Sequence, residues 1–186
     1  LETREPLRDD AIYRMASNTK LVTSVALMML QEEGLFDLGD PLAKFIPEFG
    51  EPQVLLPDAT TAADVHPAKN LISIRHLLSH SAGLSYGFVE PDSVIDQCYL
   101  NGGVNGLGEK DIDLEELCAG IAKLPLAFEP GTSWRYSFAT DVCARLVEVL
   151  SGQSFDWFLR QRIFDPLGMV DTDFWVPQEK AHRLIT

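Results

Sequence analysis

The chain has 186 residues, 46% of them apolar and 23% charged, which suits one globular domain with a real core and excludes a disordered chain. Fifteen Lys and Arg against 28 Asp and Glu give a formal net charge of −13, which disfavours nucleic acid and anionic membrane surfaces as partners. Its apolar stretch at residues 21–30 is about half as long as a membrane span requires, so we predict no transmembrane segment.

The first strong helix is predicted over residues 17–33, apolar nearly all round and therefore buried, with Gly34 as its stop. A short helix is expected over residues 42–46, ended by Pro47. Residues 51–70 are rich in Pro, Ala and Thr and lack periodicity. We therefore predict a long surface loop there.

The second half is also predicted to be mainly helical. Ser73 is expected to cap a helix that ends near Gly83, and residues 87–111 hold several glycines with few periodic apolar positions, which indicates a mobile flap. Three further helices are predicted: residues 114–123 after the capping residue Asp113, 138–150 before Gly152, and 155–163 after Ser154. Helix signals thus outnumber strand signals.

The three cysteines, Cys98, Cys118 and Cys143, are odd in number and lack Cys-x-x-Cys spacing. We predict that the three cysteines are small residues in the core, and that they form neither a disulfide framework nor a zinc site. The sequence opens at Leu1 without a methionine or a signal-peptide pattern, which leaves open a processed or truncated N-terminus. The compartment is therefore undecided, with the cytoplasm as the default.

Ser17 and Lys20 form the most informative short motif, Ser-x-x-Lys, just ahead of the apolar stretch. Three positions along a helix bring both side chains onto one face, so the amine can reach the hydroxyl and take its proton. The helix dipole also favours negative charge developing there. The competing interpretation is an ordinary capping serine followed by a solvated lysine.

A second candidate nucleophile is Ser85, because residues 83–87 match G-x-S-x-G, and Asp165 and His182 follow in the order expected of an α/β-hydrolase. Such an elbow must follow a buried strand and open a helix. The preceding residues are predicted to be helical, and Pro91 follows soon after. The pattern therefore disfavours Ser85 as the nucleophile.

Two other patterns could carry chemistry. His76 and His80 lie one helical turn apart, as in zinc proteases, but Leu77 stands where the general-base glutamate is needed. We therefore predict no metal site. Tyr136 follows a turn and could present its phenol to a site. The alternative interpretation is a core tyrosine whose hydroxyl makes one hydrogen bond.

Taken together, several segments resemble the serine β-lactamase and penicillin-binding-protein superfamily in order and spacing. They are MASNTK at 15–20, EGLFDLGDP at 33–41 and RHLLSHSAGL at 75–84. The segments FEPG at 128–131, WRYSFATDV at 134–142 and PLGM at 166–169 are most similar to the family VIII carboxylesterases, the class C β-lactamase-like esterases. The resemblance spans roughly residues 5 to 175.

The resemblance implies a serine hydrolase that cleaves small-molecule carboxylic esters without a cofactor or metal. Ser17 would be the acylated nucleophile, Lys20 its proton acceptor, and Tyr136 the phenol that moves the proton between nucleophile and leaving group. The Ser17 backbone N–H would supply half of the oxyanion hole. A lysine amine has an ordinary pKa of about 10.4, so base catalysis at neutral pH needs surroundings that favour the neutral amine.

Two departures from the superfamily pattern bear on substrate and completeness. Phe138 stands where penicillin-recognising relatives carry an asparagine that hydrogen-bonds an amide substrate, which favours esters over β-lactams or peptides. A β-lactamase or DD-peptidase-like penicillin-binding protein remains the first alternative, and a non-catalytic penicillin-sensing or scaffold domain the second. The third motif, Lys-Thr-Gly or Trp-Gly-Gly, does not occur in the chain.

The missing motif and the scarcity of strand signals predict a fragment. The expected fold is the α-rich helical lobe of the β-lactamase/transpeptidase-like α+β fold, a single partial domain over residues 1–186 with most of its antiparallel sheet outside the chain. The second oxyanion donor would then also lie outside it, and the remaining segments of the same protein would be partners. We expect weak or no ester hydrolysis by the isolated chain, and an exposed apolar face that favours association. Oligomeric state stays open.

Overall fold

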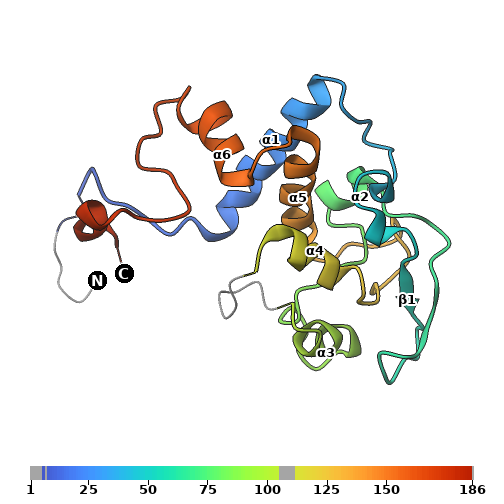
Figure 1. The fold of residues 1–186 in the computed structure, drawn as a ribbon. Helices are drawn as coiled ribbons and strands as arrows, with labels where there is room; N and C mark the ends of the chain where they lie inside the picture. Colours follow the sequence, from blue (N-terminus) through green and yellow to red (C-terminus); the bar gives the residue numbers. More distant parts are fainter. Residues whose placement is uncertain (1–5, 7, 105–111, 186) are drawn as a thin grey trace.

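The computed structural model describes residue 6 and residues 8–104 and 112–185, and Figure 1 shows their arrangement. This part of the chain is mostly helical, with a two-stranded antiparallel sheet. Its α-helices are α1 (Thr19–Glu32), α2 (Ile74–Leu78), α3 (Val94–Asn101), α4 (Leu114–Ile121), α5 (Ala139–Ser151) and α6 (Phe155–Leu159). Among these described helices, none is long and apolar enough to cross a membrane.

Helix α5 is the centre of the fold, because it packs against α1, α2, α4 and α6 (Figure 1). Its apolar residues recur at the i, i+3, i+4, i+7 spacing of a helix that buries one face. These fully buried positions are Ala139, Val142, Cys143, Leu146 and Val147. Gly152, at φ +68°, ends the helix in the left-handed conformation that glycine adopts without strain.

Helix α1 begins two residues later than the predicted helix, because Ser17 lies in a short 3₁₀ turn, η1 (Ala16–Asn18), that leads into it. The prediction that this helix is buried all round was wrong. Leu21 and Val25 expose 73% and 45% of their surface. Helix α1 packs against α5 and α6 and buries Ala26, Leu27 and Leu30, while Leu21 and Val25 stay exposed.

The segment 51–70 is not the featureless loop that its composition predicts. Strand β1 (Gln53–Leu55) pairs with β2 (Val65–Pro67) in antiparallel register, with Val54 opposite His66. The backbone of β1 also exchanges hydrogen bonds with Leu126. Strands of three residues are too short to show an alternating pattern, and a distant segment stabilises them, so no local pattern marks them.

The segment 87–111 contains a helix that the flap prediction missed. Helix α3 is capped by the Ser93 side chain, which accepts a hydrogen bond from the backbone of Asp96, and it buries Ile95 and Tyr99. Residues 105–111 of the predicted flap lie outside the described residues. The glycine-rich composition therefore concealed a short amphipathic helix at residues 94–101.

Other helix boundaries also differ from prediction. Ser73 caps α2 as predicted, but α2 ends at Leu78, well before Gly83. In place of the helix expected over residues 42–46 the chain forms a single 3₁₀ turn, η2 (Leu42–Lys44), and a second turn, η3 (Pro47–Phe49), follows it. Pro47 begins the second turn, because its fixed φ suits the first position of a helix.

The C-terminal part of the described chain returns to its N-terminal part. Helix α6 continues into a π turn over Arg160–Phe164, and a 3₁₀ helix, η5 (Gln178–Arg183), follows. Leu184 then forms a parallel bridge with Ile12, so the two ends lie side by side (Figure 1). The three cysteines are buried and free, as predicted.

Candidate active site

Ser17 lies on the turn that opens α1, directly after a residue with unusual backbone geometry. Ala16 has φ +43°, a left-handed conformation that is strained for a residue with a Cβ atom. The N–H groups of Asn18 and Thr19 donate to Met15 and Ala16 and so close the turn. Among the described residues, the backbone hydrogen bonds that close this turn come from Asn18 and Thr19 and not from the Ser17 N–H.

The structure brings Ser17, Lys20 and Tyr136 together. The Ser17 hydroxyl and the Tyr136 phenol are 2.5 Å apart, within a hydrogen bond, although 119 positions separate them in the sequence. The Lys20 Nζ lies 4.9 Å from the centroid of the Tyr136 ring. All three predicted site residues thus meet at the N-terminus of α1.

The surroundings of Tyr136 favour its phenolate. Burial acts to raise its pKa, but the hydrogen bond to Ser17 and the positive charge of Lys20 outweigh burial and bring the pKa below the ordinary value. A phenol with a lowered pKa accepts and returns a proton more readily near neutral pH. Tyr136 is therefore suited to exchange a proton with the Ser17 hydroxyl.

Tyr86 and Asp141 also lie near Lys20, and neither was predicted from the sequence. The Lys20 Nζ lies 5.4 Å from the Tyr86 ring centroid, and the Tyr86 hydroxyl donates to Asp141 at 3.3 Å. Burial raises the pKa of both side chains, although Lys20 partly opposes this for Asp141. Tyr86 follows Ser85 in the G-x-S-x-G match, and that pattern points only to the serine as a functional residue.

The two histidines of the zinc-like spacing serve separate purposes. His76 forms a capping box with Ser73 at the start of α2. The His80 ring lies 5.1 Å from the Tyr136 ring, and its Nδ1 is 3.3 Å from the Ser137 hydroxyl. Burial, together with the charge of Lys20, lowers the pKa of His80. Over the described ranges, no three His, Cys, Asp or Glu side chains cluster as metal ligands.

Ser85 is fully buried and does not form an exposed nucleophile elbow. Its hydroxyl donates to Asp96 and accepts a hydrogen bond of 2.8 Å from the Arg135 Nε. Neither Asp165, which follows the π turn, nor His182, which lies in η5, is among these partners. The hydroxyl is thus engaged with partners other than those that the elbow requires.

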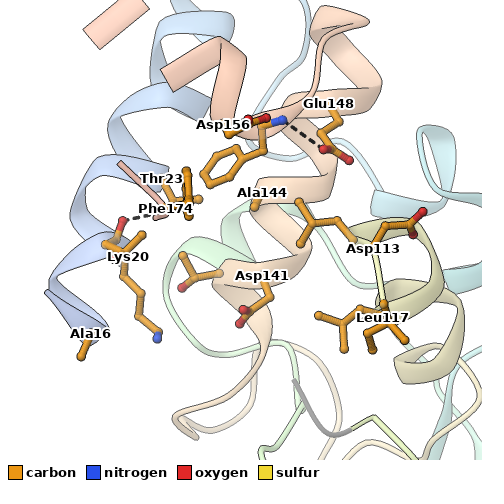
Figure 2. A pocket seen from close by; sticks show the side chains of 15 residues that line it. Ala16, Lys20, Thr23, Asp113, Leu117, Asp141, Ala144, Glu148, Asp156 and Phe174 are labelled. Atoms are coloured by element: carbon orange, nitrogen blue, oxygen red, sulfur yellow. Dashed lines mark hydrogen bonds between the residues drawn. The ribbon is translucent and has the colours of Figure 1, made fainter. Parts of the chain in front are cut away.

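A cavity of about 560 Å³ opens beside Lys20, between α1, α4, α5 and α6 (Figure 2). Figure 2 shows Lys20 and Asp141 at one end of it and Glu148 and Asp156 at the other. Its apolar lining comes from Ile112, Leu114, Leu117, Ala144, Phe155 and Phe174. The cavity therefore offers apolar surface with acidic groups at its margins.

Comparison with known proteins adds independent evidence. The beta-lactamase family model matches residues 1–186. Esterase EstB from Burkholderia gladioli is 34% identical over 174 residues, which cover 93% of this chain and 41% of the esterase. Lovastatin esterase from Penicillium rubens is 34% identical over 174 residues, which cover 92% of this chain and 42% of that enzyme.

Solved structures agree with these matches. The structure of EstCE1, described as a hydrolase with promiscuous acyltransferase activity, superposes with a TM-score of 0.81 at 28% identity and covers 100% of this chain and 45% of that one. The chain thus spans about two-fifths of the length of the curated relatives. A mostly helical structure that matches part of such folds confirms the predicted fold, an α-rich helical lobe.

Proposed function

The chain belongs to the beta-lactamase family, and on that premise we propose that it carries the nucleophile of a serine hydrolase that cleaves small-molecule carboxylic esters. Its relatives include the two esterases named above. The observation that carries the proposal is the 2.5 Å contact between the Ser17 and Tyr136 hydroxyls beside Lys20.

In the acylation step, the Ser17 Oγ attacks the ester carbonyl carbon and loses its proton to Tyr136. The resemblance implies Lys20 as the proton acceptor, but the short contact supports Tyr136, in its phenolate form, as the direct acceptor, and the positive charge of Lys20 then stabilises that phenolate. The tetrahedral intermediate then collapses, the C–O bond to the alcohol breaks, and Tyr136 returns the proton to the leaving alkoxide. The product is an ester of Ser17 with the acyl group.

In the deacylation step, water attacks the acyl-Ser17 carbonyl and gives up a proton to Tyr136, which passes it back to the Ser17 oxygen as the acid leaves. The Ser17 N–H would stabilise the oxyanion in both steps. Its partner donor would come from a part of the protein outside this chain. The 186-residue chain alone is therefore expected to turn over esters poorly.

Phe138 supports an ester substrate over an amide. Its ring is buried and packs 4.4 Å from the Tyr86 ring, centroid to centroid. An apolar ring at this position cannot hydrogen-bond an amide substrate. β-Lactam or peptide turnover therefore remains the less favoured alternative, and a penicillin-sensing domain that acylates without turnover remains the non-enzymatic one.

Acyl transfer to an alcohol is a second candidate function. Acyltransferase calJ from Penicillium decumbens is 34% identical over 165 residues. Chemically, an alcohol would replace water in the deacylation step while Ser17, Lys20 and Tyr136 keep their roles. Competition between water and an added alcohol for the same acyl-enzyme would separate the two activities.

Labelling with a fluorophosphonate tests the nucleophile. We expect intact mass spectrometry to show one adduct, and peptide mapping to place it on Ser17. Ser17→Ala should abolish the adduct, whereas Ser85→Ala serves as the matched control and should keep it. An adduct that persists in Ser17→Ala would reject Ser17 as the nucleophile. Slow loss of a substrate-derived acyl group from the full-length protein would favour the sensing domain.

A further inference from the structure

Ser85, Asp96 and Arg135 form a hydrogen-bonded cluster next to the candidate site, because Ser85 and Arg135 directly precede Tyr86 and Tyr136 in the chain. The side chains of Ser85 and Asp96 are fully buried, and that of Arg135 is only 12% exposed. Arg135 donates from Nε to Ser85 at 2.8 Å and from Nη2 to Asp96 at 2.9 Å. Ser85 in turn donates to the same Asp96 oxygen, which closes a ring of three polar side chains.

Further hydrogen bonds engage the second Asp96 oxygen and a third donor nitrogen of Arg135. The second Asp96 oxygen accepts the Glu90 N–H at 2.5 Å, and the Glu90 carboxylate accepts from Arg135 at 2.8 Å. A buried charge that lacks partners is strongly destabilising, so such a network holds its members in one arrangement. The network joins the loop at Glu90, helix α3 and the residue before Tyr136.

The same network fixes the backbone next to both tyrosines of the site. Ser85 precedes Tyr86, and Arg135 precedes Tyr136. The backbone of Arg135 donates to His80 at 2.9 Å, and the backbone of Phe138 donates to Ser85 at 3.3 Å. The two tyrosine segments are therefore tied to each other on both sides of the side-chain cluster.

We propose that Ser85, Asp96 and Arg135 are positioning residues that hold the Tyr86 and Tyr136 rings around Lys20. This role rests on the proposed function, in which Tyr136 exchanges a proton with Ser17. It also gives the G-x-S-x-G serine a purpose other than nucleophilic attack. Small displacements of a reacting group cost large factors in rate. The Ser85–Asp96–Arg135 cluster, which we call the clamp, therefore affects catalysis by holding Tyr136 in place.

The first test measures the pKa of the Tyr136 phenol rather than the rate of ester hydrolysis. The chain contains four tyrosines, so labelling with [13Cζ]tyrosine gives few signals, and Tyr136→Phe assigns the one that matters. In the parent chain the Tyr136 signal should titrate below the ordinary midpoint near pH 10. Ser85→Ala and Arg135→Lys should both move that midpoint upward, because Tyr136 loses its fixed place beside Ser17 and Lys20.

Ser151→Ala is the matched control. It also removes a serine hydroxyl, one that accepts a hydrogen bond from the Gln153 N–H at the C-terminal end of α5. This variant should leave the Tyr136 midpoint unchanged. A parental Tyr136 midpoint in folded Ser85→Ala would overturn the proposal. If Ser85→Ala does not fold, Arg135→Lys decides the question, since it keeps the charge but not the forked contact.

The second test uses the full-length protein and an ester substrate. Ser85→Ala should lower kcat about 10- to 100-fold with KM nearly unchanged, as expected when a proton-transfer group is misplaced. If the parent protein does not cleave esters but the titration shift is seen, the clamp stands and the ester proposal fails. Unchanged kcat in Ser85→Ala, with an active parent, would contradict the clamp.

Discussion

The Lys20 Nζ lies 5.4 Å from the Tyr86 ring centroid and 4.9 Å from the Tyr136 ring centroid, and its positive charge lowers the pKa of Tyr136. Its charge therefore acts on the phenol that contacts the nucleophile. At the scale of single residues, the site is best understood as a phenol tuned by one hydroxyl and one cation.

We predict that Lys20→Met raises the pKa of Tyr136 and slows fluorophosphonate labelling of Ser17 by about 10²- to 10⁴-fold, the usual contribution of a proton-transfer group. Intact mass spectrometry over time would measure the labelling rate. Lys44→Met is the control, because Lys44 pairs with Asp40 on the surface. Parental labelling by Lys20→Met would exclude an essential role for the amine.

The Ser-x-x-Lys spacing predicted that Ser17 and Lys20 act together, because residues three positions apart lie on the same face of a helix. Tyr136 could be linked to them only through resemblance to a family, since 119 residues intervene. Tyr86 and Asp141 gave no signal of their own. Their role depends on how close α5 and the loop after α2 come to α1, and no local pattern encodes that distance.

At the scale of elements, the turn that presents Ser17 contains backbone strain. Ala16, at φ +43°, occupies a region that costs an ordinary residue about 1 kcal/mol or more. Glycine has no such cost in that conformation. The strain lies immediately before the nucleophile, where the backbone must turn into η1 and α1.

We therefore predict that Ala16→Gly raises the free energy of unfolding by about 1 kcal/mol, measured by urea denaturation. The matched control is Ala119→Gly inside α4, where the same substitution should lower it by about 0.5–1 kcal/mol. A loss of stability in Ala16→Gly would show that Ala16 is not strained in solution.

Long helices with clear periodicity were predicted well, and short elements were not. Helix α5 follows its apolar spacing closely, whereas β1 and β2 have three residues each and depend on backbone bonds to Leu126. Helix α3 was missed because glycines flank it. Short elements acquire their stability from tertiary contacts, which a local pattern does not contain.

At the scale of the whole molecule, Asp96 links stability to pH. Burial acts to raise its pKa, but hydrogen bonds from Ser85, Glu90 and Arg135 outweigh burial and lower it below the ordinary value. A carboxyl whose pKa is lower in the folded state stabilises the fold above its unfolded pKa, near 3.9. That stability is lost as the pH falls through the folded pKa.

We predict that the parent chain loses stability below about pH 4, and that Asp96→Asn is less stable by about 2–4 kcal/mol at pH 7 with a flatter pH dependence. Denaturation at pH 7 and pH 3 would measure both effects. Asp58→Asn, at an exposed position, is the control and should follow the parent. Equal pH dependence of Asp96→Asn and the parent would refute the linkage.

The exposed face of α1 is the other property of the whole molecule. Leu21 and Val25 lie on it, 73% and 45% exposed. Exposed apolar patches favour association, so we predict that the 186-residue chain self-associates as its concentration rises, measured by sedimentation velocity. Leu21→Glu with Val25→Glu should shift the chain toward monomer. Leu167→Glu, at a 70% exposed position elsewhere, should not; an equal effect would argue against the α1 face.

The sequence by itself determined the helical class, the Ser17 and Lys20 pair and, through resemblance, the family, because periodicity and motif spacing are local properties of the chain. Only the tertiary structure decided which side of α1 stays exposed, how Tyr136 meets Ser17, and that Ser85 is bonded inside the protein rather than presented to a substrate. These outcomes depend on contacts between residues far apart in sequence, and packing alone fixes such contacts.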